Sequence, residues 1–266
     1  MSSPERQITV PQFAGMKAAG RKITMLTAYD HTMAGLIDSV GIEGILVGDS
    51  LAMVVQGRAN TLPVTLDEMI YHAEMVGRAV RRALVVVDMP FLTYHLGRCN
   101  AIENAGRILK ETRCQAVKLE QGPSQVEIIA ALVSAGIPVM AHLGLRPQNV
   151  HQLGGFRVQR DRERLLADAQ AAEQAGAFSI VLECIPADVA AEITAAVGIP
   201  TIGIGAGAGC DGQILVVHDL LGLGPGRPPR HAKAYAQLGG LILEAVTRYR
   251  DEVRDGTFPG AEQTFD

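Results

Sequence analysis

Apolar runs of similar length recur along the chain, and most of them are separated by segments with helical periodicity. The runs cover residues 22–30, 44–50, 83–90, 116–120, 138–144, 178–184, 200–207 and 213–219. Most are continuously apolar and do not alternate, which is typical of parallel strands that are covered on both faces. The pattern therefore predicts eight buried, parallel strands.

The segments between the runs are amphipathic and predict helices. They cover residues 65–80, 101–113, 124–136, 162–176 and 186–198, and residues 9–20 add a helix before the first strand. Gly136, Gly176 and Gly198 have the position of helix C-caps, and Ser124 and Glu127 have the spacing of a capping box. The connection between the last two runs is too short for a full helix.

This alternation of strands and helices predicts an α/β fold. Eight strands in 266 residues favour a single (β/α)8 TIM barrel domain over residues 1–266, with an additional N-terminal helix. A doubly wound open sheet is the alternative, and the strand count and chain length weigh against it. We expect the segment 231–256 to complete the outer ring of helices.

Composition and charge exclude several classes of partner. Lys and Arg number 24 and Asp and Glu number 28, and a net charge of -4 argues against binding nucleic acid or an anionic membrane. No apolar run reaches the roughly 18 residues that a membrane span needs, and the polar start MSSPERQ lacks the apolar region of a signal peptide. The cysteines Cys99, Cys114, Cys184 and Cys210 are scattered, which predicts reduced thiols in a cytoplasmic protein.

Polar residues stand at the ends of the apolar runs. Asp49, Asp88, Glu120 and Glu183 end four of them, and the remaining ends include Asp30, His142 and the pair His218–Asp219. In a parallel barrel the C-terminal ends of all strands meet at one mouth, which carries the active site. One polar residue at a strand end can simply mark the start of a loop, but four carboxylates predict a shared site.

The run AVKLE raises the question of buried charge. Lys118 and Glu120 are two residues apart, so they point to the same side of a strand, and burying them is costly unless they are paired or bind a metal. A cluster of carboxylates without thiolates favours Mg²⁺ or Mn²⁺ over Zn²⁺, and Lys118 would attract an anionic substrate. A structural Lys–Glu pair is the alternative, as is a structural role for His142.

The glycine-rich stretch GIGAGAGCDG, residues 203–212, allows a G-x-G-x-x-A interpretation. A dinucleotide site requires a strand, a turn and a helix in that order, and no helix clearly follows this stretch. We expect the glycines to allow a tight turn or a close approach of the backbone.

Several stretches together resemble the ketopantoate hydroxymethyltransferase family. They are TAYDHTMAGLID, ILVGDSLAMVVQG, TLPVTLDEMIYH, VVVDMPF, AVKLE, HLGLRPQNV, VLECIP, PTIGIGAGAGCDGQILVVHDLLG and FPGAEQTF, and they keep the family's order over most of the chain. The resemblance implies a (β/α)8 barrel that binds one Mg²⁺ per subunit.

The resemblance also implies roles for individual residues. Asp49, Asp88 and Glu120 match the metal-binding positions, and Asp49, Ser50, Asp88 and Lys118 match those that hold a 2-oxo acid. Glu183 matches the catalytic base. His142 is expected to bind substrate or to orient the metal ligands.

The activity implied by the resemblance is a one-carbon transfer in pantothenate biosynthesis. A hydroxymethyl group would pass from 5,10-methylenetetrahydrofolate to 3-methyl-2-oxobutanoate through a Mg-stabilised enolate, giving 2-dehydropantoate. The family also implies a homo-oligomer, commonly a decamer. The sequence departs from the family pattern at Gln121, in a shortened segment 154–166, and at Pro229–His231.

Two other functions are compatible with such a barrel. A Mg²⁺-dependent lyase acting on another 2-oxo acid usually needs a cysteine in a mobile loop, and no cysteine follows a strand in a matching loop. A catalytically silent binding subunit would be expected to lack Glu183 or one of the metal carboxylates, whereas all of them are present.

Overall fold

The computed structural model describes residues 6–120, 125–224 and 229–265. The chain forms two compact units, one that ends at Val216 and one that begins at Val217. Each unit is described separately below, and one domain over residues 1–266 stays a prediction. Gln121 and the predicted capping residue Ser124 lie outside the described residues.

The first unit is a closed barrel of eight parallel strands. Each strand pairs with the next in sequence, and β8 pairs with β1 to close the sheet. The strands are β1 (Ile23–Thr27), β2 (Gly44–Val47), β3 (Leu84–Asp88), β4 (Ala116–Glu120), β5 (Val139–Gly144), β6 (Ser179–Glu183), β7 (Thr201–Ile204) and β8 (Gly212–Leu215). The predicted (β/α)8 fold is confirmed, and every predicted strand is present.

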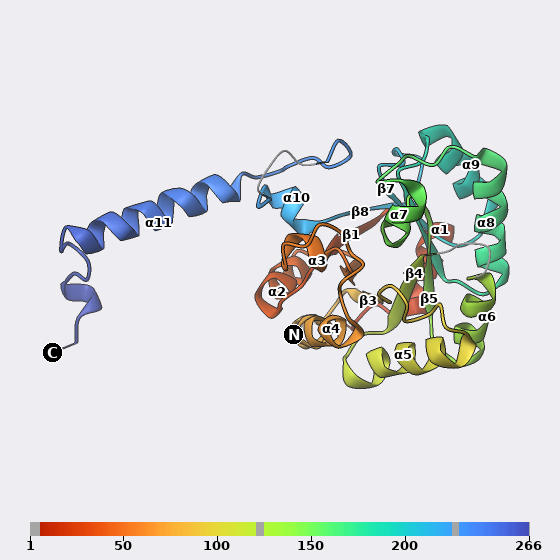
Figure 1. Cartoon of the computed structure of the whole chain (residues 1–266), viewed down its shortest axis with the longest axis horizontal. Coiled ribbons are helices and arrows are strands. Elements are labelled where there is room, and N and C mark those ends of the chain that lie inside the picture. Colours follow the sequence, from red (N-terminus) through yellow and green to blue (C-terminus); the bar gives the residue numbers. More distant parts are fainter. Residues whose placement is uncertain (1–5, 121–124, 225–228, 266) are drawn as a thin grey trace. The chain divides into compact units, whose positions relative to one another are not determined.

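Helices surround the strands, as Figure 1 shows for α4, α5, α6, α8 and α9. The helices of this unit are α1 (Val10–Ala18), α2 (His31–Ser39), α3 (Leu51–Val54), α4 (Leu66–Ala79), α5 (Arg98–Glu111), α6 (Val126–Ser134), α7 (Val150–Leu153), α8 (Arg162–Gln174) and α9 (Ala187–Ala196), together with the 3₁₀ turn η1 (Pro147–Asn149). The predicted helices are all found, and α2, α3 and α7 are additional to them.

Local sequence explains where several helices begin and end. Thr65 caps α4 in a capping box with Glu68. Asp30 caps α2, because its side chain accepts the N–H of Met33; its position at a strand end therefore reflects a helix start. Gly136 and Gly176 have positive φ angles after α6 and α8, as predicted for C-caps. α9 instead ends at Ala196 and is followed by Val197 in extended backbone, so the prediction for Gly198 is wrong.

The glycine-rich stretch connects β7 directly to β8 without a helix. A side chain at Gly207 would place its Cβ 2.5 Å from the Cβ of Ala187, the first residue of α9. The glycines therefore let the loop pass close to α9, and the strand–turn–helix order of a dinucleotide site is missing.

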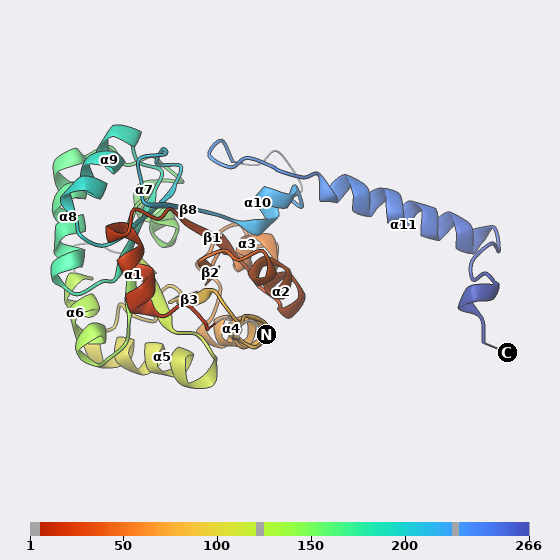
Figure 2. The same cartoon turned by 180° about the vertical axis from the view of Figure 1, so that it is seen from behind.

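One end of the barrel is closed by α1. Figure 2 shows α1 in front of the strands, whereas α7 lies in front of them in Figure 1, so the two helices lie at opposite ends. Phe13 and Met16 of α1 pack into an apolar cluster with interior side chains from all eight strands. The ring of Phe13 meets that of Phe178 edge to face, with centroids 5.8 Å apart.

A buried carboxylate fixes the start of β3. Asp38, near the end of α2, accepts the backbone N–H groups of Arg81 at 2.8 Å, Arg82 at 3.2 Å and Ala83 at 2.8 Å. β3 begins at the next residue, Leu84. The turn before this strand is therefore held by hydrogen bonds to one side chain.

The second unit contains α10 (Val217–Leu221), α11 (Leu238–Arg254) and the 3₁₀ turn η2 (Ala261–Gln263). The eighth strand was predicted to continue to residue 219, but β8 ends at Leu215 and the next residues form α10. His218 and Asp219 therefore do not occupy opposite faces of a strand. The predicted helix in 231–256 is present as α11, and its place in the outer ring stays a prediction. Across the described residues, no helix has both the length and the apolar character needed to cross a membrane.

Candidate active site

In β3, β4 and β6, interior side chains two residues apart change from apolar at one end of the strand to polar at the other. Ala116 of β4 belongs to the apolar cluster, and Lys118 and Glu120 follow it at i+2 and i+4. The same step leads from Val86 to Asp88 in β3 and from Val181 to Glu183 in β6. The predicted convergence at the C-terminal mouth is therefore built into the strand register.

Lys118 and Asp88 form a buried ion pair across two neighbouring strands. Their Cα atoms are register partners, and the Nζ of Lys118 donates to Oδ1 of Asp88. The other carboxylate oxygen of Asp88 accepts the backbone N–H of Asp49 at 3.0 Å. A carboxylate with a charged and an amide donor is well satisfied, so this pair can persist in the barrel interior.

Glu120 and Asp49 are connected through Gln148 of η1. The backbone N–H of Gln148 donates to both carboxylate oxygens of Glu120, at 3.2 and 3.1 Å, and its side-chain Nε2 donates to Oδ2 of Asp49 at 2.9 Å. Tyr94, which is almost fully buried, donates its hydroxyl to Oε1 of Gln148 at 2.6 Å. Asp49 and Glu120 are themselves only 5% and 4% exposed.

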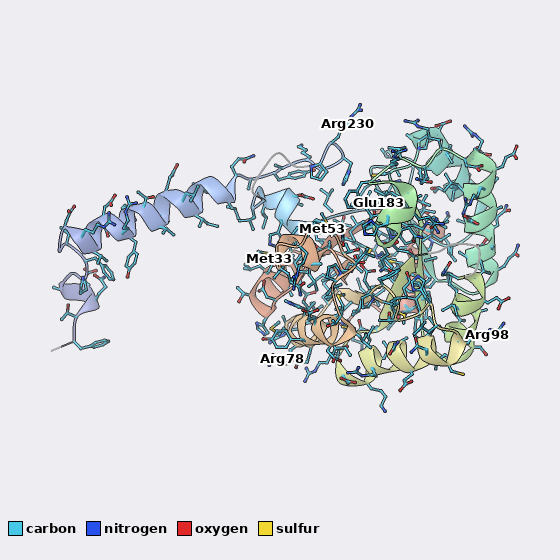
Figure 3. All side chains as sticks on the ribbon, in the orientation of Figure 1. Met33, Met53, Arg78, Arg98, Glu183 and Arg230 are labelled. Carbon is cyan, nitrogen blue, oxygen red and sulfur yellow. The ribbon has the colours of Figure 1, made fainter. Side chains whose placement is uncertain are left out.

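Glu183 lies at the end of β6, next to His142 of β5. Their closest approach is 3.4 Å, between Nε2 of His142 and Oε2 of Glu183. Nε2 is also 2.7 Å from the carbonyl oxygen of Leu145, which can only accept, so this nitrogen carries the proton. Nδ1 is then an acceptor, and it is buried without a hydrogen-bond partner among the described residues. Glu183 is labelled in Figure 3.

The backbone around Glu183 depends on a glycine. Gly144 has a φ of +94°, and a Cβ there would lie 2.2 Å from the carbonyl oxygen of Glu183. That carbonyl accepts the N–H of Leu145 at 2.8 Å. Cys184, the residue after Glu183, also has a positive φ, of 49°, which is uncommon for a residue with a side chain. Glu183 is therefore held by a close and locally strained approach of the ends of β5 and β6, where Gly144 and Glu183 are register partners.

Ser50 lies beside the acids at the start of α3. Its hydroxyl is 2.8 Å from that of Tyr29. Gly48, two residues before Ser50, has no room for a side chain, because a Cβ would lie 2.8 Å from Oγ of Ser50 and 3.5 Å from Oδ2 of Asp88. Ser50 is thus within the same cluster as the carboxylates.

The pKa values at the site are shifted because several acids are buried together with one lysine. Desolvation, together with the charge of Asp88, raises the pKa of Asp49 to about 6. Desolvation also raises the pKa of Glu183 to about 8 and that of Glu120 well above its usual value. Burial by itself lowers the pKa of Lys118, but the charges of Asp88, Asp49 and Glu120 outweigh it and raise this pKa. If all the acids were ionised, they would carry more negative charge than Lys118 can compensate, so without a cation the protonated form of some of them is favoured.

His142 is neutral at this site. Desolvation and the nearby charge of Lys118 hold its pKa well below the usual value. The contact between His142 and Glu183 is therefore one between a neutral imidazole and a carboxyl group, and not an ion pair. His142 adds no positive charge to the cluster.

The donor set fits a hard divalent cation. Its oxygens come from Asp49, Asp88 and Glu120, and a cation would neutralise their excess charge. Within the described part of the chain, no three His, Cys, Asp or Glu side chains are already gathered into a cage. Mg²⁺ commonly takes one or two carboxylates and keeps several waters, so it does not require such a cage. Shared binding by all three acids stays a prediction.

The structure brings together all the residues predicted for this site, and it adds two. Their positions at the ends of apolar runs predict Asp49, Asp88, Glu120, His142 and Glu183, strand periodicity adds Lys118, and the family resemblance adds Ser50. Gln148 and Tyr94 come from the segments that follow β5 and β3, where no periodic pattern indicates which side chains point inward. HLGLRPQNV begins within β5 at His142 and places Gln148 four residues after the strand ends at Gly144, which is the available signal for Gln148.

Comparison with known structures supports the fold. A 2,3-dimethylmalate lyase of the PEP mutase/isocitrate lyase superfamily matches with a TM-score of 0.64 at 20% identity, over 98% of this chain and 93% of that chain. A phosphonopyruvate hydrolase in complex with oxalate and Mg²⁺ matches with a TM-score of 0.61 at 15% identity, over 96% and 93%. At these identities the likeness shows the barrel architecture alone.

Much closer relatives are found by sequence. The 3-methyl-2-oxobutanoate hydroxymethyltransferase of Rhodopirellula baltica is 54% identical over 260 residues, covering 98% of this chain and 97% of its own. That of Desulforapulum autotrophicum is 55% identical over 259 residues, covering 97% and 98%. The family model for ketopantoate hydroxymethyltransferase matches residues 7–261. The chain therefore belongs to the ketopantoate hydroxymethyltransferase family.

Proposed function

We propose that this protein is a 3-methyl-2-oxobutanoate hydroxymethyltransferase that uses 5,10-methylenetetrahydrofolate and Mg²⁺ in pantothenate biosynthesis. Family membership supports the activity. The observation that carries the mechanism is the position of Glu183, a carboxylate of raised pKa, at the same barrel mouth as Lys118 and the three other acids.

The 2-oxo acid would bind through Asp49, Ser50, Asp88 and Lys118. The ammonium of Lys118 supplies positive charge for the substrate carboxylate, and the hydroxyl of Ser50 can donate a hydrogen bond. Asp49, Asp88 and Glu120 would hold Mg²⁺, which when bound supplies positive charge that stabilises a negative oxygen on the substrate. The acids are themselves ordered by donors from Lys118, Asp49 and Gln148.

Glu183 would remove the C3 proton of 3-methyl-2-oxobutanoate. Burial raises the pKa of Glu183 to about 8, which makes its ionised form a stronger base than an exposed carboxylate. Proton removal leaves an enolate, whose C3 attacks the methylene carbon of the folate. The methylene carbon is bonded to two folate nitrogens. The new carbon–carbon bond replaces one of these bonds, and the carbon–oxygen bond formed with water replaces the other. The proton taken from C3 and one proton of the water go to the two nitrogens, so the products are 2-dehydropantoate and tetrahydrofolate. His142, which is neutral and has an Nδ1 acceptor without a hydrogen-bond partner among the described residues, would bind the substrate or orient the metal ligands.

The lyase alternative receives no support from the closer relatives, since those at 50–55% identity are hydroxymethyltransferases by name. A silent barrel is disfavoured because the base and all three candidate metal carboxylates lie in one mouth. A homo-oligomer, with a decamer as the expected form, and a cytoplasmic location remain part of this proposal.

Isotope exchange tests the first chemical step without folate. The protein is incubated with 3-methyl-2-oxobutanoate and Mg²⁺ in deuterated water, and loss of the C3 proton is followed by NMR. We expect exchange in the wild type, its loss with EDTA, and a fall of about 100-fold or more in Glu183→Gln.

Glu74→Gln is a matched control, because Glu74 forms an exposed ion pair with Arg78 on α4. It should exchange at the wild-type rate. A folded wild type that shows no exchange with Mg²⁺ present would count against the enolate mechanism. Unchanged exchange in Glu183→Gln would remove Glu183 from the role of base. Addition of 5,10-methylenetetrahydrofolate then tests formation of 2-dehydropantoate.

A further inference from the structure

Both polar atoms of the Gln148 side chain and its backbone N–H form hydrogen bonds inside the acid cluster. Its side-chain Nε2 donates to Oδ2 of Asp49 at 2.9 Å and to the carbonyl oxygen of Met89 at 3.0 Å. Both partners are acceptors, so the side of the amide that faces them must be the NH₂ group. Its Oε1 accepts a hydrogen bond from the hydroxyl of Tyr94 at 2.6 Å, so both ends of the side-chain amide are held in one orientation.

Tyr94 links this amide back to β4. Its hydroxyl oxygen accepts the backbone N–H of Glu120 at 3.3 Å while its proton goes to Gln148. The backbone N–H of Gln148 in turn donates to the Glu120 carboxylate. The result is a closed network in which Tyr94 and Gln148 tie the backbone and side chain of Glu120 to the carboxylate of Asp49.

All members of this network are buried. Tyr94 is 1% exposed and Gln148 is 4% exposed. Breaking one bond therefore leaves a buried polar group without a partner, and such a network holds its members in one arrangement. Gln148 donates to both carboxylates, to Asp49 through its side-chain amide and to Glu120 through its backbone N–H. Both donors are neutral, so they add no fixed charge that would compete with a cation.

We propose that Gln148, held by Tyr94, is a positioning residue that sets the orientation of Asp49 and Glu120 for binding a divalent cation. This inference rests on the proposed function, because that function supplies the reason for a cation at the mouth. Groups that orient metal ligands from outside the coordination sphere commonly contribute a factor of about 10–100 to metal affinity. The affinity of this site for a divalent cation therefore depends on a residue that need not touch the ion.

Mn²⁺ is a suitable probe, because electron paramagnetic resonance measures free Mn²⁺ directly in the presence of protein. We compare the Kd for Mn²⁺ of the full-length wild type, Gln148→Leu and Tyr94→Phe. Gln148→Leu keeps a side chain of similar size and the backbone donor to Glu120 but removes the bonds to Asp49 and Tyr94. We expect its Kd to rise about 10–100-fold, and that of Tyr94→Phe to rise less, because the amide still reaches Asp49.

Asn149→Ala is the matched control. Asn149 is the next residue in the same turn, and its side chain donates to Gln152 and not to the acids. Its Kd should equal that of the wild type. The Tm of each protein in EDTA reports stability separately, so a variant that is only destabilised would show a lower Tm with an unchanged Kd.

An unchanged Kd in folded Gln148→Leu would overturn the inference. If that variant does not fold, an unchanged Kd in Tyr94→Phe overturns it instead. A wild type that binds no Mn²⁺, yet exchanges the C3 proton in EDTA, would overturn it while leaving the transferase activity standing. Binding of Mn²⁺ without exchange would contradict the enolate mechanism and leave the positioning role to be decided by the variants' Kd values.

Discussion

The two ends of the barrel are built from the same strands but have opposite chemistry. At the α1 end, Phe13 and Met16 close an apolar cluster that includes Val86 and Ala116. At the other end, two residues further along the same strands, Asp88 and Lys118 form a buried ion pair. The apolar end gains free energy from burial, whereas the polar end keeps charges in an environment that disfavours them.

This difference indicates a division of labour within one closed sheet. The apolar cluster packs the strands together at the α1 end. This packing holds acids from different strands near one another at the mouth, despite their repulsion. Backbone strain occurs at the mouth, where the non-glycine residue Cys184 has a positive φ angle, and buried charged side chains lie there as well. Substitutions at the two ends should therefore separate stability from activity.

The largest effect is expected from removal of the positive charge at the mouth. Lys118→Met leaves the buried acids without their cationic partner, so we expect the exchange rate to fall by about 100-fold or more and the free energy of unfolding at pH 8 to fall by about 3–5 kcal/mol. The loss of stability should be smaller at pH 5, where the acids can take up protons. Isotope exchange and urea unfolding at both pH values measure these effects.

Lys17→Met provides the control for that experiment. Lys17 of α1 forms a partly buried ion pair with Asp211 at 3.0 Å, within the same unit but outside the acid cluster. This variant should lose some stability and keep the exchange rate of the wild type. Equal loss of exchange in both lysine variants would contradict the division between the two ends.

At the apolar end, Phe13→Ala should lower stability without affecting chemistry. Phe13 is fully buried against Phe178, and truncation of such a ring costs about 3–5 kcal/mol. Denaturant unfolding measures the loss, and the exchange rate per folded molecule should stay within about twofold of the wild type, since no part of the ring reaches the mouth. A tenfold drop in that rate would show that the ends are coupled.

A smaller effect is expected from a substitution where the ends of β5 and β6 lie in close contact. Gly144→Ala forces a Cβ against the Glu183 carbonyl, so we expect a loss of about 1–3 kcal/mol in stability and a clear fall in exchange, because displacing a reacting group by about 1 Å can cost 100-fold. Gly136→Ala introduces a Cβ at a similar φ of +81° with nothing within 4 Å. Gly136→Ala should lose stability but keep the exchange rate of the wild type. If both variants lower the exchange rate equally, the close contact between Gly144 and Glu183 does not position the base.

The smallest effect is a pH dependence of stability without metal. Burial raises the pKa of Asp49 to about 6 and of Glu183 to about 8, so protonation of these groups favours the folded state. Their stabilising contribution is complete below the usual carboxyl pKa near 4 and is lost as the pH rises through the raised values. In EDTA the Tm should fall by several degrees from pH 5 to pH 8, and Mg²⁺ should reduce this fall. A Tm that rises over this range would contradict the assignment.

Sequence periodicity was sufficient for the barrel and for most of the mouth. Continuous apolar runs identify the strands, and a period of two places Lys118 on the same face as Glu120, which the contacts with Asp88 and Gln148 confirm. The same reasoning extended the last strand through Val216 to Asp219, because a short apolar helix and a strand have the same composition over a few residues. The structure there forms α10.

The periodicity of apolar residues does not predict which side chains of irregular segments point into the mouth. The position of Gln148 depends on how the chain leaves β5 through Gly144 and η1, and the position of Tyr94 depends on the segment between β3 and α5. Neither segment has a repeat that relates sequence spacing to side-chain direction. Their roles follow from hydrogen bonds that form only after the barrel has closed.

Asp38 links the closed end of the barrel to the chemistry at its mouth. By binding three successive N–H groups it fixes which residue starts β3. A slip of one residue in that strand would turn Asp88 from the lumen to the helical layer and bring Val87 inward in its place. A carboxylate that never meets substrate thus determines, from the far end of a five-residue strand, whether the mouth contains its ion pair at all.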